Sequence, residues 1–244
     1  MKSFAPIHKK PRISQEVVAQ LKNAILTGLY KPGEKIPPER ELTEQFQVSR
    51  VVIREALREL ELKGFVKIHQ GPAGGAYVLD LSFDQLSDAL LDLFKAGKLS
   101  VVELIQVRLH IEPEIARLAA LNADARAIDR LKQALEREQE TGTSHSATVS
   151  RRFQVDHILA EMCGNRLYQA ISKAILDLTR EIILVVKSNR TVIFRHDEHV
   201  QIVRAVEQRD PEAAAEAVRR HLMSIGTGLE QLEKAYRKQM GFAK

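Results

Sequence analysis

The sequence predicts a mostly α-helical protein made of two parts. Between residues 13 and 79, three helical patterns are followed by a β-prone segment with a glycine-rich centre. From about residue 84 onward, apolar residues recur almost everywhere at the spacing of amphipathic helices. The chain has 244 residues, 44% of them hydrophobic and 28% charged, which is enough for two small domains with their own cores.

The first part begins with a helix from residue 13 to Gly28, followed by the segment LYKPGEKIPPE, whose three prolines indicate an extended loop. A short helix over residues 39–45 and a brief turn lead to a longer helix, with Ser49 as its N-cap and Gly64 as its end. The apolar residues of this longer helix recur at offsets of four and seven: Ile53, Leu57 and Leu60.

The segment FVKIHQGPAGGAYV contains two short β-prone runs around a glycine-rich tip, which predicts a β-hairpin. Helix, short helix, turn, helix and hairpin follow one another in the order of a winged helix-turn-helix. We therefore assign residues 13–79 to such a domain, preceded by a flexible arm at residues 1–12.

The second part is predicted to be an all-helical bundle of six or seven helices over residues 85–236, after a linker at 80–84 and before a tail at 237–244. In this part TGTSHSATVS has the composition of a loop. No apolar run approaches the roughly 18 to 20 residues of a membrane span, and no signal peptide is recognisable. With a single cysteine, Cys163, these features predict a cytoplasmic protein.

Basic residues are concentrated in the first part. Residues 1–80 contain 13 Lys and Arg against 9 Asp and Glu, whereas the rest is nearly balanced at 24 against 23. After Ser49, Arg50, Arg54 and Arg58 recur every four residues, away from the apolar face. Such guanidinium groups can bind guanine edges or bridge phosphates. An exposed helix stitched by ion pairs to nearby glutamates is the alternative, but the neighbouring elements favour a DNA-reading surface.

The segment from LTGLYKPGEK to GPAGGAYV closely resembles the DNA-binding domain of the GntR family of bacterial transcription regulators. Its most specific markers are PPERELTEQFQVSR and REALRELELKG. Val51 departs from the small polar residue common in relatives, which favours an apolar contact such as a thymine methyl group. The resemblance implies DNA contacts from the helices and the wing by Arg40, Ser49, Arg50, Arg54, His69, Gln70 and Gly71.

The second part resembles the all-helical effector domain of the FadR subfamily, called FCD, through ELIQVRLHIEPEIARLAA and EHVQIVRAVEQRDPEAAAEAVRRHL. Many relatives hold a divalent metal in the centre of this bundle through an aspartate, a histidine four residues later and two further histidines. The metal helps to hold a small carboxylate. His199 and His221 match the two later histidines, 22 residues apart.

The other two ligand positions differ in this chain. In relatives the first ligating histidine lies nine residues before the asparagine of a Gly-Asn pair. Counting back from Asn165 gives Asp156 rather than His157, and four residues further back gives Arg152. The resemblance therefore implies that arginine and aspartate stand where relatives have aspartate and histidine.

This exchange allows two arrangements. In one, Asp156, His199 and His221 form a two-histidine, one-carboxylate site for a divalent metal such as zinc, nickel, iron or manganese. In the other, Arg152 pairs with Asp156 at the i, i+4 spacing and itself binds an anionic effector. A positive charge beside two imidazoles opposes metal binding, which favours the second arrangement.

Arg108, in VRLHIEP, is a further candidate for the effector site, because relatives often direct an arginine from this position at the effector carboxylate. A guanidinium in a cavity can bind a carboxylate through two parallel hydrogen bonds. A structural salt bridge from Arg108 to Glu112, four residues later, is the alternative.

Together these features predict a homodimeric transcription regulator, a repressor, that binds double-stranded DNA at an inverted-repeat operator and responds to a small carboxylate. A metal-dependent enzyme that uses the two-histidine, one-aspartate site is the alternative from another class. Against it, no base or nucleophile is identifiable near that site, and the DNA-reading part would have no role. An architectural DNA binder without a ligand would leave the larger second part unexplained.

Overall fold

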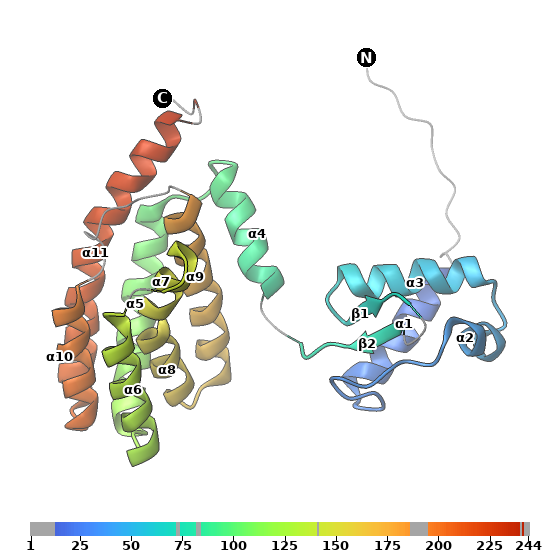
Figure 1. Ribbon diagram of the computed structural model, residues 1–244, viewed down its shortest axis with the longest axis horizontal. Coiled ribbons are helices and arrows are strands. Elements are labelled where there is room, and N and C mark those ends of the chain that lie inside the picture. The colour runs from blue at the N-terminus through green and yellow to red at the C-terminus, as the bar shows by residue number, and fades with distance from the viewer. Residues whose placement is uncertain are drawn as a thin grey trace. The chain divides into compact units, whose positions relative to one another are not determined.

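The computed structural model describes residues 13–71, 74–81, 84–140, 142–185, 195–239 and 241. It divides into two compact units between Gln85 and Leu86, and each unit has its own apolar core (Figure 1). The arm proposed at residues 1–12 lies outside the described residues. So do residues 82–83 of the proposed linker and residues 240 and 242–244 of the proposed tail.

The N-terminal unit confirms the predicted winged helix-turn-helix. Between α2 and α3, Gln47 adopts the left-handed conformation with φ of 52°, which makes the turn tight. The Ser49 hydroxyl accepts a hydrogen bond from the Val52 N–H at 3.4 Å and so caps α3. The elements in chain order are α1 (Ile13–Leu26), α2 (Glu39–Phe46), α3 (Arg50–Leu62), β1 (Val66–His69) and β2 (Gly75–Val78).

The two strands form an antiparallel hairpin, the wing, in which Val66 pairs with Val78 and His69 with Gly75. The backbone N–H of Ile68 in β1 donates to Glu61 Oε1 at 2.8 Å, so the wing is attached to the end of α3. The core beneath is built from apolar side chains of α1, α3 and the strands, among them Val18, Leu21, Ile53, Leu57, Leu60, Val66 and Val78.

The tip of the wing depends on its glycines. Gly71 has φ of +103°, a conformation that side chains with a Cβ rarely adopt. A Cβ on Gly74 would lie 2.5 Å from the His69 carbonyl oxygen and 2.7 Å from that of Gly71. Both distances are below van der Waals contact, so position 74 requires glycine.

The C-terminal unit confirms the predicted all-helical fold. None of the described helices is long and apolar enough to cross a membrane. Its described residues form eight helices, bounded as α4 (Asp84–Lys95), α5 (Val101–Leu121), α6 (Ala125–Glu138), α7 (His145–Arg152), α8 (Gln154–Met162), α9 (Arg166–Val185), α10 (His196–Glu207) and α11 (Pro211–Gln239).

One of these helices was not expected. Most of TGTSHSATVS, interpreted from its composition as a loop, belongs to α7. Ser144 caps this short helix by accepting a hydrogen bond from the Ala147 N–H at 3.1 Å, and Val149 is its buried anchor. The serines and threonine that indicate a loop in the sequence thus supply a helix cap and an exposed face.

The core of the C-terminal unit is organised by α5 and α11, which lie side by side (Figure 1). Gly226 of α11 faces Ile105 of α5, and a Cβ on this glycine would come within 3.3 Å of Ile105 Cγ2. The absence of a side chain therefore allows the close approach of the two helices.

The C-terminal part of α11 holds the connection between α4 and α5. Arg237 donates to the carbonyl oxygens of Phe94 at 3.2 Å and Leu99 at 2.7 Å, and it also pairs with Glu233. The second carboxylate oxygen of Glu233 accepts the Val101 N–H at 2.8 Å. This group of contacts, the α11 clamp, satisfies backbone polar groups on both sides of the turn between α4 and α5.

Neighbouring residues on α11 provide a stability test of this packing. Leu222→Ala should destabilise the protein by about 2–5 kcal/mol, because its side chain is fully buried and its removal leaves a cavity. Met223→Ala, at a position that is 62% exposed, should change stability by less than about 0.5 kcal/mol. Urea unfolding followed by far-UV circular dichroism measures both. Equal effects of the two changes would contradict the packing described for α11.

Candidate DNA interface and buried ligand site

The first turns of α3 place the predicted DNA-contacting side chains at the surface. Arg50, Val51 and Arg54 are all exposed, Val51 to 74%. Ser49 stands just before them, where the unpaired N–H groups of a helix N-terminus favour a phosphate. This end of α3 therefore combines two guanidinium groups, an apolar surface and a helix terminus suited to phosphate.

Two of the predicted arginines have carboxylate partners in the DNA-free protein. Arg54 Nε lies 2.9 Å from Glu39 Oε2, and Arg40 Nε lies 3.2 Å from Glu44 Oε1. Both pairs are exposed, so each contributes at most about 1 kcal/mol and can be exchanged for a contact to DNA. Glu39 lies in the PPER motif beside Arg40, but nothing in the sequence marks it as the partner of Arg54.

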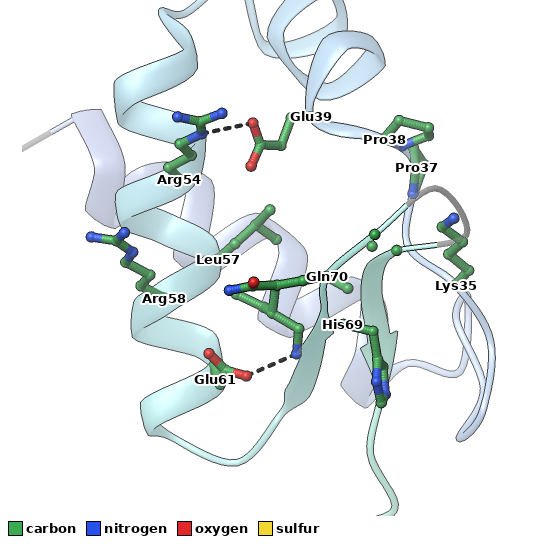
Figure 2. Close-up of a pocket in the computed structure, with 15 residues that line it drawn as sticks. Lys35, Pro37, Pro38, Glu39, Arg54, Leu57, Arg58, Glu61, His69 and Gln70 are labelled. Carbon is green, nitrogen blue, oxygen red and sulfur yellow. Dashed lines mark hydrogen bonds and ion pairs between the residues drawn. The ribbon is translucent and has the colours of Figure 1, made fainter.

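A cleft of about 800 Å³ lies between α3 and the wing (Figure 2). Arg54 and Arg58 line it from α3, and His69, Gln70 and Gly71 line it from the end of β1 and the following loop. Four of the predicted DNA contacts therefore border one cleft, namely Arg54, His69, Gln70 and Gly71, whereas Arg40, Ser49, Arg50 and Val51 do not line it. Its lining also includes Glu39, Glu61 and several apolar residues, and its basic side chains suited to the phosphates of a nucleic-acid backbone are Lys35, Arg54 and Arg58.

In the C-terminal unit, the five residues predicted for the effector site line one small cavity. Its volume of about 10 Å³ is close to that needed for a single water molecule or ion. The side chains around it are Arg108, Arg152, Phe153, Asp156, Thr179, Ile183, His199, His221 and Ile225. They come from α5, α7, α8, α9, α10 and α11 and the residue between α7 and α8, so almost the whole bundle contributes to this cavity.

Two buried histidines face each other across the cavity. His199 Nε2 and His221 Nε2 are 3.2 Å apart. Asp156, which is half-buried on α8, completes a group in which one ligand atom from each residue lies within 4.8 Å of the others. The register that places Asp156, and not His157, at the site is consistent with this geometry.

Each of these histidines also has a glutamate behind it. His221 Nδ1 lies 2.8 Å from Glu198 Oε2 in a hydrogen bond. His199 Nδ1 lies 2.7 Å from Glu138 Oε1, at an angle too oblique for a regular hydrogen bond, so this contact is chiefly electrostatic. Glu138 is buried at the end of α6, and its other oxygen is 3.1 Å from His196 Nδ1.

These contacts shift the pKa of His199 and that of Glu198. Burial lowers the pKa of His199, but contact with Glu138 and the negative charge of Asp156 outweigh it, so the pKa is raised above its ordinary value. Burial raises the pKa of Glu198, yet hydrogen bonds from His221 and Ser224 outweigh this effect and lower it. Both shifts favour the charged forms.

Arg108 forms the salt bridge to Glu112 that the sequence suggests as the alternative to effector binding. Its Nε and Nη2 lie 2.6 Å and 3.0 Å from the two carboxylate oxygens of Glu112, and both side chains are buried. Burial lowers the pKa of Arg108, but Glu112 outweighs it and keeps the pKa above its ordinary value. The buried Nη1 of Arg108 has no hydrogen-bond partner in the described part of the chain, so one donor remains beside the cavity.

The segment that carries the two exchanged positions is not one continuous helix. α7 ends at Arg152, α8 begins at Gln154, and Phe153 forms the turn between them. The i, i+4 spacing expected to join Arg152 to Asp156 within a single helix therefore spans a break, although both side chains line the cavity. Sequence reasoning also missed Glu138 and Glu198. Glu198 adjoins His199 in the sequence, but nothing in the sequence marks Glu138.

A winged helix-turn-helix with exposed arginines, joined to a helical unit with a charged central cavity, defines the class of ligand-responsive transcription regulators. The model for bacterial regulatory proteins of the gntR family matches residues 13–78, and that for the FCD domain matches residues 103–224. The chain belongs to the GntR family. It is a transcription regulator and not an enzyme.

Relatives extend over most of the chain. The HTH-type transcriptional repressor NanR of Citrobacter rodentium is 32% identical over 90% of this chain and 86% of its own length. The Uxu operon transcriptional regulator of Escherichia coli K12 is also 32% identical, over 86% of this chain and 84% of its own. Among solved structures, Streptococcus agalactiae GntR is similar with a TM-score of 0.63 and 25% identity, covering 88% of this chain and 99% of that one.

The buried pair of Arg108 and Glu112 leads to a stability prediction. Glu112→Ala should destabilise the protein by about 3–5 kcal/mol, because it leaves the Arg108 charge buried without a counter-ion. Glu114→Ala removes the partly exposed partner of Arg117 from the same helix and should cost less than about 1 kcal/mol. Chemical unfolding of the two variants compares them directly, and similar losses would argue against a special role for the buried pair.

Proposed function

We propose that this chain is a repressor that binds double-stranded DNA as a homodimer and releases it when a small carboxylate enters the C-terminal unit. The observation that carries the proposal is the cavity in which Arg108, Arg152, Asp156, His199 and His221 meet. Similarity to the repressor NanR of Citrobacter rodentium supports the sign of regulation. A two-fold dimer would recognise an inverted-repeat operator.

The DNA contacts are proposed from the exposed end of α3 and from the wing. Arg50 and Arg54 suit guanine edges in the major groove, and Val51 suits a thymine methyl group. The remaining contacts are to the backbone or minor groove, from Arg40, Ser49, His69, Gln70 and Gly71. To contact DNA, Arg54 and Arg40 must leave their carboxylate partners. Both ion pairs are exposed and therefore weak, so their loss opposes DNA binding only slightly.

The cavity has the donor set for a divalent cation. Asp156 and the two Nε2 atoms form a two-histidine, one-carboxylate group that leaves coordination positions open. Facing Nε2 lone pairs 3.2 Å apart repel each other unless a proton or a cation lies between them. A divalent ion bound here would supply a positive centre for the effector carboxylate, with zinc, nickel, iron and manganese as candidates.

The arginines supply the second attraction for an acid. Arg108 offers its unsatisfied Nη1, and Arg152 lines the same cavity from the end of α7. A cavity of about 10 Å³ is too small for an organic acid, so entry requires side chains or helices to move. The conformation that holds the effector therefore differs from the one described, as a change in operator affinity requires.

Replacement of Arg54 tests the DNA interface. Against a duplex selected from random sequence by the wild-type protein, Arg54→Ala should weaken binding by about 1–3 kcal/mol and relax selectivity at one base pair. Fluorescence anisotropy at several salt concentrations gives both the affinity and its salt dependence. Arg219→Ala, which removes an exposed arginine of α11, serves as the control. Unchanged binding by the Arg54 variant would remove this residue from the interface.

Titration of metal-free protein tests the cavity. Zinc or manganese should bind, and a hundredfold excess over Kd should stabilise the protein by about 2.7 kcal/mol. His199→Asn should abolish this stabilisation, whereas His157→Asn, one residue beyond Asp156, should retain it. Calorimetry and thermal unfolding with small carboxylates complete the measurement. If the protein binds no metal and a small acid stabilises it in the presence of chelator, the metal site is excluded and the arginines are the groups that bind the acid.

A further inference from the structure

Each histidine of the cavity has its own carboxylate on the side away from the other histidine. Glu198 lies behind His221 at 2.8 Å, and Glu138 lies behind His199 at 2.7 Å. The two glutamates come from α10 and α6, so the arrangement joins separate parts of the bundle. In both pairs a carboxylate oxygen lies within 2.8 Å of Nδ1, as a hydrogen bond at His221 and as an oblique electrostatic contact at His199, which indicates a shared role in orienting the rings.

A carboxylate at Nδ1 determines where the imidazole carries its proton. In His221, Nδ1–H donates to Glu198, so the neutral ring presents an unprotonated Nε2, and the negative charge of Glu138 favours the same proton position in His199. In both rings Nε2 is the atom that faces the cavity. With a cation at Nε2, the glutamates keep the remaining proton of each ring on Nδ1, and their negative charge makes Nε2 a stronger ligand.

His196 contacts the same glutamate, Glu138, that lies behind His199. His196 is the first residue of α10 and uses Nδ1 to contact the second oxygen of Glu138 at 3.1 Å. It is one-third exposed and does not belong to the described group of potential ligands. The HxxH pattern formed by His196 and His199 therefore contains one potential ligand and one residue that holds the carboxylate behind it.

We propose that Glu138 and Glu198 are positioning residues that orient His199 and His221 for a divalent cation and fix the proton on each Nδ1. This inference rests on the proposed metal site. It assigns the buried carboxylates a role beyond stabilising the fold, because each acts on the ring atom opposite the cavity. A role confined to helix packing predicts no effect of either glutamate on the proton position or on metal affinity.

Replacement of Glu198 is the more tractable test, because its side chain is 21% exposed whereas Glu138 is buried. Glu198→Ala should lower zinc affinity about 10- to 100-fold, and Glu198→Gln should lower it less, since the amide oxygen still accepts Nδ1–H. Glu138→Gln should act in the same way through His199. Zinc affinity is measured by competition with a fluorescent chelator on full-length protein.

A second readout does not require metal. Long-range ¹H–¹⁵N NMR of chelated protein should show Nδ1 of His221 protonated in the wild type, with the proton moved to Nε2 in Glu198→Ala. Glu207→Ala, on the exposed face of the same helix, controls for the loss of a glutamate from α10. Circular dichroism establishes that each variant is folded before its affinity is compared.

The outcomes separate the two proposals. Reduced zinc affinity together with a displaced proton supports the positioning role. Wild-type affinity and an unchanged proton position in the Glu198 and Glu138 variants would overturn it while leaving the metal site intact. Absence of zinc binding by the wild-type protein would overturn the metal site, and the NMR spectrum would still decide whether Glu198 sets the protonation of His221.

Discussion

The C-terminal unit depends on keeping several charges buried together at its centre. An isolated buried charge is costly, so each must have a partner of opposite sign within hydrogen-bond distance. Arg108 meets this requirement with Glu112 along one turn of α5, the buried Glu138 carboxylate meets it across helices against His199, and Glu198 accepts a hydrogen bond from His221 of the next helix. The cross-helix pairs fix α6, α10 and α11 relative to one another. They thereby hold His199 and His221 in place at the wall of the small cavity.

The size of the cavity links ligand binding to conformation. A ligand larger than an ion must displace some of its walls, and one wall is formed by His221 and Ile225 of α11. The α11 clamp at Arg237 lies sixteen residues beyond His221, about 24 Å along the helix axis. A helix moves largely as a rigid body. A displacement of α11 at the cavity therefore also strains the hydrogen bonds from Arg237 to Phe94 and Leu99, which hold the end of α4.

The sequence was informative wherever structure is decided locally. The cap at Ser49, the arginine spacing on α3 and the glycines of the wing are short-range features, and the fold predicted from them is confirmed. It failed at α7, whose polar composition does not distinguish a capped helix from a loop. Glu138 was also missed, because its role depends on contacts 58 and 61 residues away, which no local pattern encodes.

The environment of Arg152 changes how its presence is interpreted. From the sequence alone, an arginine at this position opposes metal binding, because it places a positive charge beside two imidazoles. The structure adds Glu112, Glu138 and Glu198 to Asp156 around the cavity, so four carboxylates stand against Arg108 and Arg152. Exposed Arg195, 3.7 Å from Glu198, offsets this excess only through solvent. The carboxylates near the cavity therefore outnumber its arginines, so Arg152 is compatible with the proposed metal site.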